Sequence, residues 1–80
     1  MKIGVVTGNV WATKKSECLT GHPLLLVSTD AGLWVADDLV GAGVGDRVLV
    51  ATGSAARLCN REAPVDAAIV AILDQSVETN

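Results

Sequence analysis

The sequence predicts a mainly all-β chain that folds as one small, mostly antiparallel barrel of about five strands with one short helix. Three observations lead to this fold class. Eighty residues suit one domain, so residues 1–80 form a single unit. Turn-forming residues divide the chain into five apolar segments of strand length. Half of the residues are hydrophobic, with two Trp and no Phe or Tyr, and small or branched side chains suit thin sheets.

The five predicted strands are separated by segments rich in turn residues. They span residues 2–11, 23–28, 33–38, 46–52 and 66–74. Asp30, Ala31 and Gly32, between the second and third strands, are typical of a tight hairpin turn. A domain this small buries only about 60% of its surface on folding. Its surplus of apolar residues therefore predicts coverage by partner subunits.

The last apolar segment is compatible with a helix as well as with a strand. Pro64 suits the first position of a helix, Asp66 suits its positive N-terminal end, and the alanines that follow favour helix. In contrast, Ile69 and Ile72 are β-formers, and the uninterrupted apolar run is typical of a strand covered on both faces. The residues alone leave both alternatives open.

Two glycine-bearing bends flank the fourth predicted strand. Gly41, Gly43 and Gly45 stand at alternate positions, where they permit positive φ angles and the close approach of another backbone. We expect the carboxylate of Asp38 to accept backbone N–H groups of the turn that follows it. After the strand, Ser54 is predicted as the N-cap of a single helical turn.

Charge and composition exclude several classes of partner. Six basic and nine acidic residues give a net charge of −3, and aromatic residues for base stacking are almost absent, so nucleic acid is not expected as a partner. No apolar run reaches the roughly 20 residues of a membrane-spanning helix, and no signal-peptide pattern is present, so we expect a cytosolic protein. Cys18 and Cys59 lie far apart and are read as reduced thiols.

Candidate catalytic and metal-binding residues are few. His22 is the sole histidine and lies in a Gly-His-Pro turn, where solvent exposure is favoured. With Cys18 it supplies two of the ligands that zinc requires, and no third is evident. Asp37 and Asp38 are neighbours on a predicted strand, so their side chains point to opposite faces and cannot share one substrate atom. The sequence therefore predicts no catalytic, cofactor or metal site.

The chain also resembles, nearly end to end, the pentameric vertex proteins of bacterial microcompartment shells, the EutN/CcmL type. The segment V-A-D-D-L-V-G-A-G-V-G-D at residues 35–46, which leads through a strand to G-S-A-A-R at residues 53–57, carries the resemblance most strongly. The opening segment 3–15, the L-L-L-V run at 24–27 and the closing P-V-D-A-A-I-V-A-I-L-D at 64–74 extend it. The resemblance favours a strand for the last segment.

This resemblance implies an OB-like barrel that assembles into a homopentamer. The pentamer is expected to cap the fivefold vertices of a polyhedral shell tiled by hexameric shell proteins, in the bacterial cytoplasm, and to supply the curvature that closes the shell. Neither catalysis nor a cofactor is implied. The alternative is a small OB-like ligand-binding module, because such barrels often carry ligands on an exposed sheet face, and an enzyme is the third possibility.

Two sets of residues are predicted to matter for assembly. The first set is expected to form the subunit interface and the corner that shapes it. It comprises Asp38, Gly41, Gly43, Gly45, Ile69, Ala71 and Leu73. For Ile69, Ala71 and Leu73, the alternative is that their neighbours on the opposite face of the closing strand form the interface. The second is the turn of Ser54, Ala55, Ala56 and Arg57, expected near the fivefold opening, with Arg57 bonded across the interface.

The chain departs from the family pattern in two places. Asp37 stands where the family usually has a branched apolar residue, so this carboxylate should stay near solvent or find a cation. The connection around residues 28–33 is shorter than is common in the family. Lys14 and Lys15 match the basic pair after the opening strand, and a solvated surface is favoured for them over salt bridges between subunits.

Overall fold

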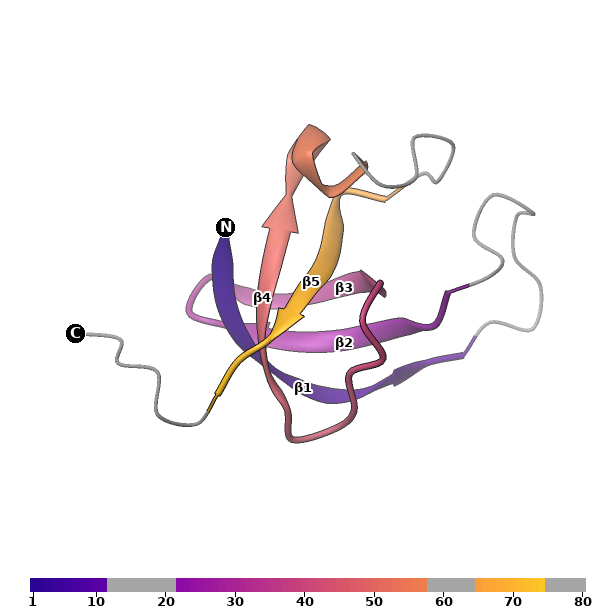
Figure 1. The fold of residues 1–80 in the computed structure, drawn as a ribbon, viewed down its shortest axis with the longest axis vertical. Coiled ribbons are helices and arrows are strands. Elements are labelled where there is room, and N and C mark those ends of the chain that lie inside the picture. Colours follow the sequence, from indigo (N-terminus) through magenta and orange to yellow (C-terminus); the bar gives the residue numbers. More distant parts are fainter. Residues whose placement is uncertain (12–21, 58–64, 75–80) are drawn as a thin grey trace.

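The computed structural model describes residues 1–11, 22–57 and 65–74 (Figure 1). Five strands and one short helical turn make up this part of the chain. They are β1 (Lys2–Val10), β2 (Leu24–Thr29), β3 (Gly32–Asp38), β4 (Arg47–Thr52), the 3₁₀ turn η2 (Gly53–Arg57) and β5 (Ala67–Ile72). All five predicted strands are confirmed, with ends that differ by one or two residues. The turn begins at Gly53, one residue before the predicted N-cap Ser54.

The strands close into a barrel in the order β1-β2-β3-β5-β4. Every neighbouring pair is antiparallel except β3 and β5, which run parallel and pair only Asp37 with Ala68 and Asp38 with Ile69. Figure 1 shows β4 and β5 crossing the hairpin of β2 and β3. The mostly antiparallel barrel is therefore confirmed, and its shortest seam lies between β3 and β5. In the described part of the chain, no helix has the length and apolarity to span a membrane.

The last apolar segment is a strand. β5 pairs with β4 along its whole length and with β3 at its start. Ala67, Ala68 and Ile69 are each fully buried. At the start of β5, where neighbouring strands lie on both edges and three consecutive residues are buried, no polar position is needed.

The β2–β3 hairpin closes through a two-residue turn. Asp30 and Ala31 lie between the paired residues Thr29 and Gly32, and Gly32 supplies a positive φ of 103°. The Thr29 hydroxyl donates to the Gly32 carbonyl at 3.0 Å and accepts from the Ala31 N–H at 3.1 Å. The predicted tight turn is thus confirmed, and it is stabilised by a threonine that the sequence reasoning did not include.

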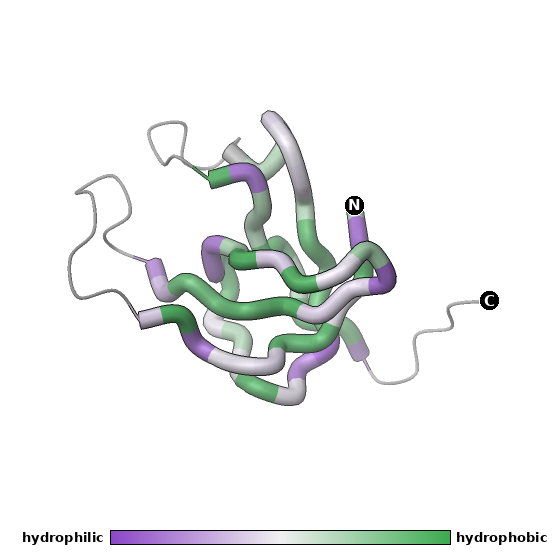
Figure 2. The backbone as a smooth tube through the Cα atoms, turned by 180° about the vertical axis from the view of Figure 1, so that it is seen from behind, coloured by the Kyte–Doolittle hydropathy of each residue, from purple (hydrophilic) through white to green (hydrophobic). Residues whose placement is uncertain are grey.

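The core lies inside the barrel and consists of small and branched side chains. In Figure 2 the hydrophobic stretches follow the strands, while hydrophilic residues lie mostly at turns and strand ends. Trp34 and Ala42 are partly buried and pack against this core. Its buried members are Val6, Leu25, Val27, Ala36, Val48, Val50, Ala67 and Ile69.

Candidate functional site: a braced corner and two apolar faces

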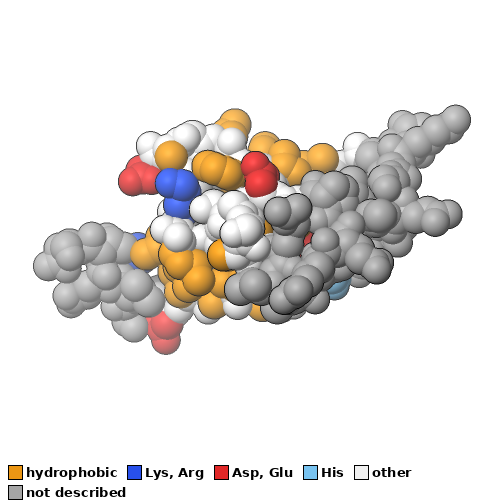
Figure 3. All heavy atoms as spheres, turned by 90° about the horizontal axis from the view of Figure 1, so that it is seen from above, with side chains coloured by type: hydrophobic (Ala, Val, Ile, Leu, Met, Phe, Trp, Pro, Cys, Tyr) orange, Lys and Arg blue, Asp and Glu red, His pale blue; other side chains and the backbone are white. Residues whose placement is uncertain are grey.

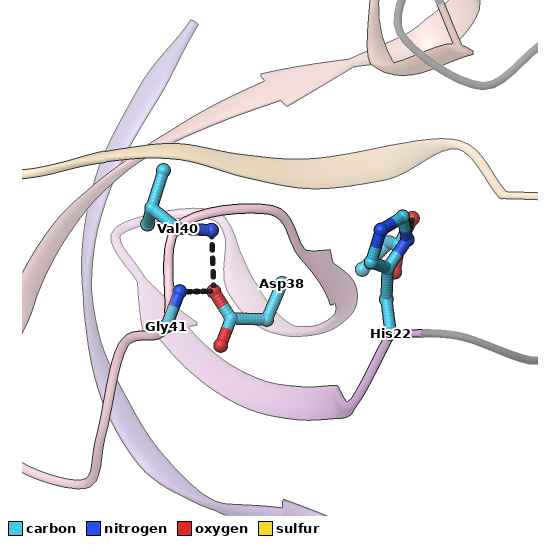
Figure 4. A network of polar contacts seen from close by, with 5 residues as sticks. His22, Asp38, Val40 and Gly41 are labelled. Carbon is cyan, nitrogen blue, oxygen red and sulfur yellow. Dashed lines mark hydrogen bonds and ion pairs between the residues drawn. The ribbon is translucent and has the colours of Figure 1, made fainter.

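The corner between β3 and β4 is held by the carboxylate of Asp38. Its Oδ1 accepts the backbone N–H groups of Val40 at 3.2 Å, Gly41 at 3.1 Å and Ala42 at 3.2 Å. Figure 4 shows this carboxylate pointing into the turn from the end of β3. Asp38 is 4% exposed, so these bonds are shielded from competing water. The predicted bracing role of Asp38 is confirmed.

A second carboxylate holds the other end of the corner. Asp46 Oδ2 accepts the N–H of Gly43 at 2.8 Å, and the Asp46 N–H donates to the Gly43 carbonyl at 3.0 Å. The corner is then tied to β1, because the Gly45 N–H donates to the Val6 carbonyl at 2.9 Å and the Val6 N–H donates to the Asp46 carbonyl at 3.0 Å. Sequence reasoning missed the role of Asp46. The spacing Gly-x-x-Asp was its only signal.

The three corner glycines are not equivalent. Gly41 and Gly45 adopt positive φ angles of 78° and 94°, which strongly favour glycine. Gly43 does not, and a Cβ added there would meet only the Asp46 carboxylate, at 3.9 Å. Within one subunit the expected conformational need for glycine is therefore confirmed at positions 41 and 45 and is wrong for Gly43.

An apolar surface, which we call the β4 face, covers the outer side of β1, β4 and β5. Val48 and Val50 point into the core, so Leu49 between them points outward. Leu49 pairs with Ile3 on one side and with Ala71 on the other. The next row holds Val5 and Arg47, and the Leu73 N–H donates to the Arg47 carbonyl at 2.7 Å. The apolar members of the β4 face are Ile3, Val5, Leu49, Ala71 and Leu73.

The β4 face continues into the corner. A shallow groove of about 320 Å³ is lined by Val5, Gly45, Asp46, Arg47 and Leu73. Val44, the chain neighbour of the lining residue Gly45, is 64% exposed. The sequence-predicted corner and the outer residues of the closing strand therefore lie on one continuous surface.

Ile69 is not part of this surface. It is fully buried in the barrel core, so the prediction that its side chain forms the subunit interface is wrong. The cause is a bulge in β5, where Val50 pairs with Ile69 but the neighbouring Leu49 pairs with Ala71. The extra residue reverses the alternation of side chains. As a result Ile69 points inward, whereas Ala71 shares the outer face with Leu49.

A second apolar surface, which we call the hairpin face, lies on the outer side of β2 and β3. Leu26 pairs with Val35, and Ser28 pairs with Leu33. Leu33 is 65% exposed and Val35 is 47% exposed, while their neighbours Leu25, Val27 and Ala36 fill the core. Sequence reasoning named neither the hairpin face nor Ile3, Val5 and Leu49. Outward apolar residues that alternate with core residues were the available signal.

The turn η2 presents only part of its predicted surface. Ser54 and Ala55 are exposed, as a role at a fivefold opening requires. Ala56 is 5% exposed, and η2 contacts both β4 and β5. The expectation that Ala56 leaves room for another chain is therefore wrong, because its side chain packs within its own subunit. The Arg57 side chain lies outside the described residues, as do Lys14, Lys15, Cys18 and Cys59.

Asp37 forms an ion pair with His22 when the imidazole is protonated. His22 Nδ1 lies 3.3 Å from Asp37 Oδ2, and the two side chains are 39% and 7% exposed. Figure 4 shows His22 at the entrance to β2, beside the end of β3. Asp37 was expected to stay near solvent or to find a cation; it is buried, and the group beside it is the His22 imidazole, which is a cation only when protonated. Among the described residues, no group of three or more His, Cys, Asp or Glu side chains could hold a metal ion.

Comparison with known proteins identifies the relatives of this barrel. Residues 1–74 match the family described as ethanolamine utilisation protein EutN/carboxysome. The carboxysome shell vertex protein CcmL of Nostoc sp. is 45% identical over 92% of this chain and 83% of its own length. The microcompartment shell vertex protein EutN of Salmonella typhimurium is 37% identical over 96% of this chain and 87% of its own length.

Solved structures agree with these sequence matches. The pentameric microcompartment shell protein GrpN from Rhodospirillum rubrum superposes with a TM-score of 0.85 at 39% identity, and the match covers 100% of both chains. An ethanolamine utilization protein EutN superposes with a TM-score of 0.88 at 37% identity over 98% of this chain and 91% of its own. In sequence and in fold, this chain belongs to the EutN/CcmL family.

Proposed function

We propose that this chain is a structural shell protein whose pentamer occupies the fivefold vertices of a bacterial microcompartment. The observation that carries the proposal is the amount of apolar surface on so small a barrel. In the described part of the chain, nine large apolar side chains are at least 39% exposed. Surfaces of this kind mark protein contacts rather than a stable monomer. The relatives named above are shell vertex proteins, and GrpN is pentameric.

The role of such a pentamer is geometric. A layer tiled by hexamers stays flat, and fivefold units introduce the curvature that closes it into a polyhedron. The partners are therefore four further copies of the chain and the hexameric shell proteins around them. The place of action is the shell of a microcompartment in the bacterial cytoplasm.

A non-catalytic role is part of this proposal. Asp38 and Asp46, the two carboxylates that hold the corner, both accept backbone N–H groups of the corner. Asp37 is paired with His22. These groups stabilise the shape of the subunit, and the named relatives are structural shell proteins.

Within the ring, we assign the β4 face and the adjoining corner to one subunit contact. Ala71, Leu73, Ile3 and Leu49 supply apolar surface, while Asp38, Gly41 and Gly45 set the direction of the corner beside it. Gly43 leaves room for a neighbouring backbone. The exposed Ser54 and Ala55 are assigned to the rim of the central opening, with Arg57 bonded at the interface.

Native mass spectrometry of the purified chain tests the proposal. We expect a closed species of five times the 8.2 kDa chain mass, without a bound small molecule. Co-expression with hexameric shell proteins should give closed shells, whereas hexamers alone should give open sheets or tubes. A stable monomer at micromolar concentration would overturn the proposal, and a monomer that carries a ligand would favour the binding-module alternative.

A further inference from the structure

We draw no further inference here: the strongest candidate, the groove of about 590 Å³ between the start of β1 and the residues Ser28, Thr29 and Asp30, carries nothing, because Lys2 in its wall already lies 5.8 Å from the centroid of the Trp34 ring and because nothing in the structure, including the mixed hydrophobic and charged surface in Figure 3, shows what covers it.

Discussion

The Oδ1 atom of Asp38 accepts the backbone N–H of Gly41 at 3.1 Å, and it is the shared acceptor for two further N–H groups of the same turn. Because Asp38 is the last residue of β3 and pairs with Ile69, the turn is fixed to the β3–β5 seam. This seam has only two residue pairs, so the carboxylate stabilises the part of the barrel with the fewest strand contacts.

Asp38→Ala should therefore lower the stability of the subunit. Three donors lose a shielded, charged acceptor, and we expect a loss of about 2 to 3 kcal/mol in the free energy of unfolding. Asp38→Asn keeps one acceptor oxygen and should lose about 1 kcal/mol. Urea denaturation of the three proteins measures both values. Equal stability of parent and Asp38→Ala would show that water replaces the carboxylate without loss.

Gly41→Ala and Gly43→Ala should separate two reasons for glycine in the corner. Gly41 has a φ of 78°, and alanine there should reduce subunit stability by about 1 to 2 kcal/mol. Gly43 has an ordinary φ and space for a Cβ. Alanine at position 43 should therefore change subunit stability by less than about 0.5 kcal/mol. If Gly43→Val leaves the subunit stable but raises the concentration at which rings dissociate, a neighbouring chain lies against this position.

Gly4→Ala should destabilise the β1–β2 seam strongly. A Cβ at this position would lie 2.6 Å from Val27 Cγ1, 2.7 Å from the Ser28 carbonyl oxygen and 2.9 Å from Thr29 Cγ2. Two of these three atoms are side-chain carbons, but the carbonyl belongs to the paired strand, so β1 and β2 must move apart. We expect a loss of about 3 kcal/mol in the free energy of unfolding.

Gly8→Ala is the matched control for Gly4→Ala. Gly8 lies on the same strand, and a Cβ there meets no atom within 4 Å. Thermal unfolding should give Gly8→Ala a midpoint equal to or slightly above that of the parent, because alanine restricts the unfolded chain. A loss of similar size in both variants would mean that strand β1 disfavours any substitution of glycine.

The residues themselves were sufficient for the first four strands and for Asp38, and the family resemblance favoured a strand for the fifth, but neither predicted the face on which each residue of β5 lies. In the structure, Leu25 and Val27 of β2 and Val48 and Val50 of β4 are buried at every second position, as regular strand alternation requires. In β5 the bulge between the pairs of Ile69 and Ala71 reverses this alternation, and an uninterrupted apolar run contains no signal for its position.

The corner shows a second limit. Three glycines at alternate positions predict an unusual turn, but their spacing does not say which of them have positive φ. That choice depends on the carboxylates of Asp38 and Asp46, which fix the corner from its two ends. Similarly, Asp37 lies on the outward side of β3 and reads as a solvent-facing residue, yet it is buried next to His22. The first outcome depends on local contacts within the corner, and the second depends on a contact between two separate segments.

Asp37→Val and His22→Ala should have different effects on stability. Replacing the buried carboxylate by a branched apolar side chain removes the need to shield a charge, so Asp37→Val should range from no change to a gain of about 1 kcal/mol. His22→Ala leaves the carboxylate buried without this partner and should lose about 1 to 2 kcal/mol. In the double variant, the loss from His22→Ala should disappear. A persistent loss would mean that His22 acts through packing and not through Asp37.

Ala55→Leu should weaken the ring without weakening the barrel. Ala55 is exposed on η2, so a larger side chain fits a single subunit and should change its stability by less than about 0.5 kcal/mol. At the rim of a fivefold opening, however, five added side chains would crowd one another, and rings should dissociate at higher protein concentration. Ala56→Leu is the contrasting control, because Ala56 is 5% exposed and overpacking should cost the subunit about 1 to 3 kcal/mol.

Arg57→Ala tests the same turn from its C-terminal end. If the guanidinium is paired across the interface, its removal should weaken assembly by about 1 to 3 kcal/mol per site, while circular dichroism of the barrel stays unchanged. Sedimentation of a concentration series measures ring dissociation for Arg57→Ala and Ala55→Leu beside the parent. If the dissociation curves of all three proteins coincide, neither the leucine side chain added by Ala55→Leu nor the guanidinium removed by Arg57→Ala contacts a neighbouring subunit. That result would place η2 away from the fivefold axis, and the ring would then be held by its apolar surfaces.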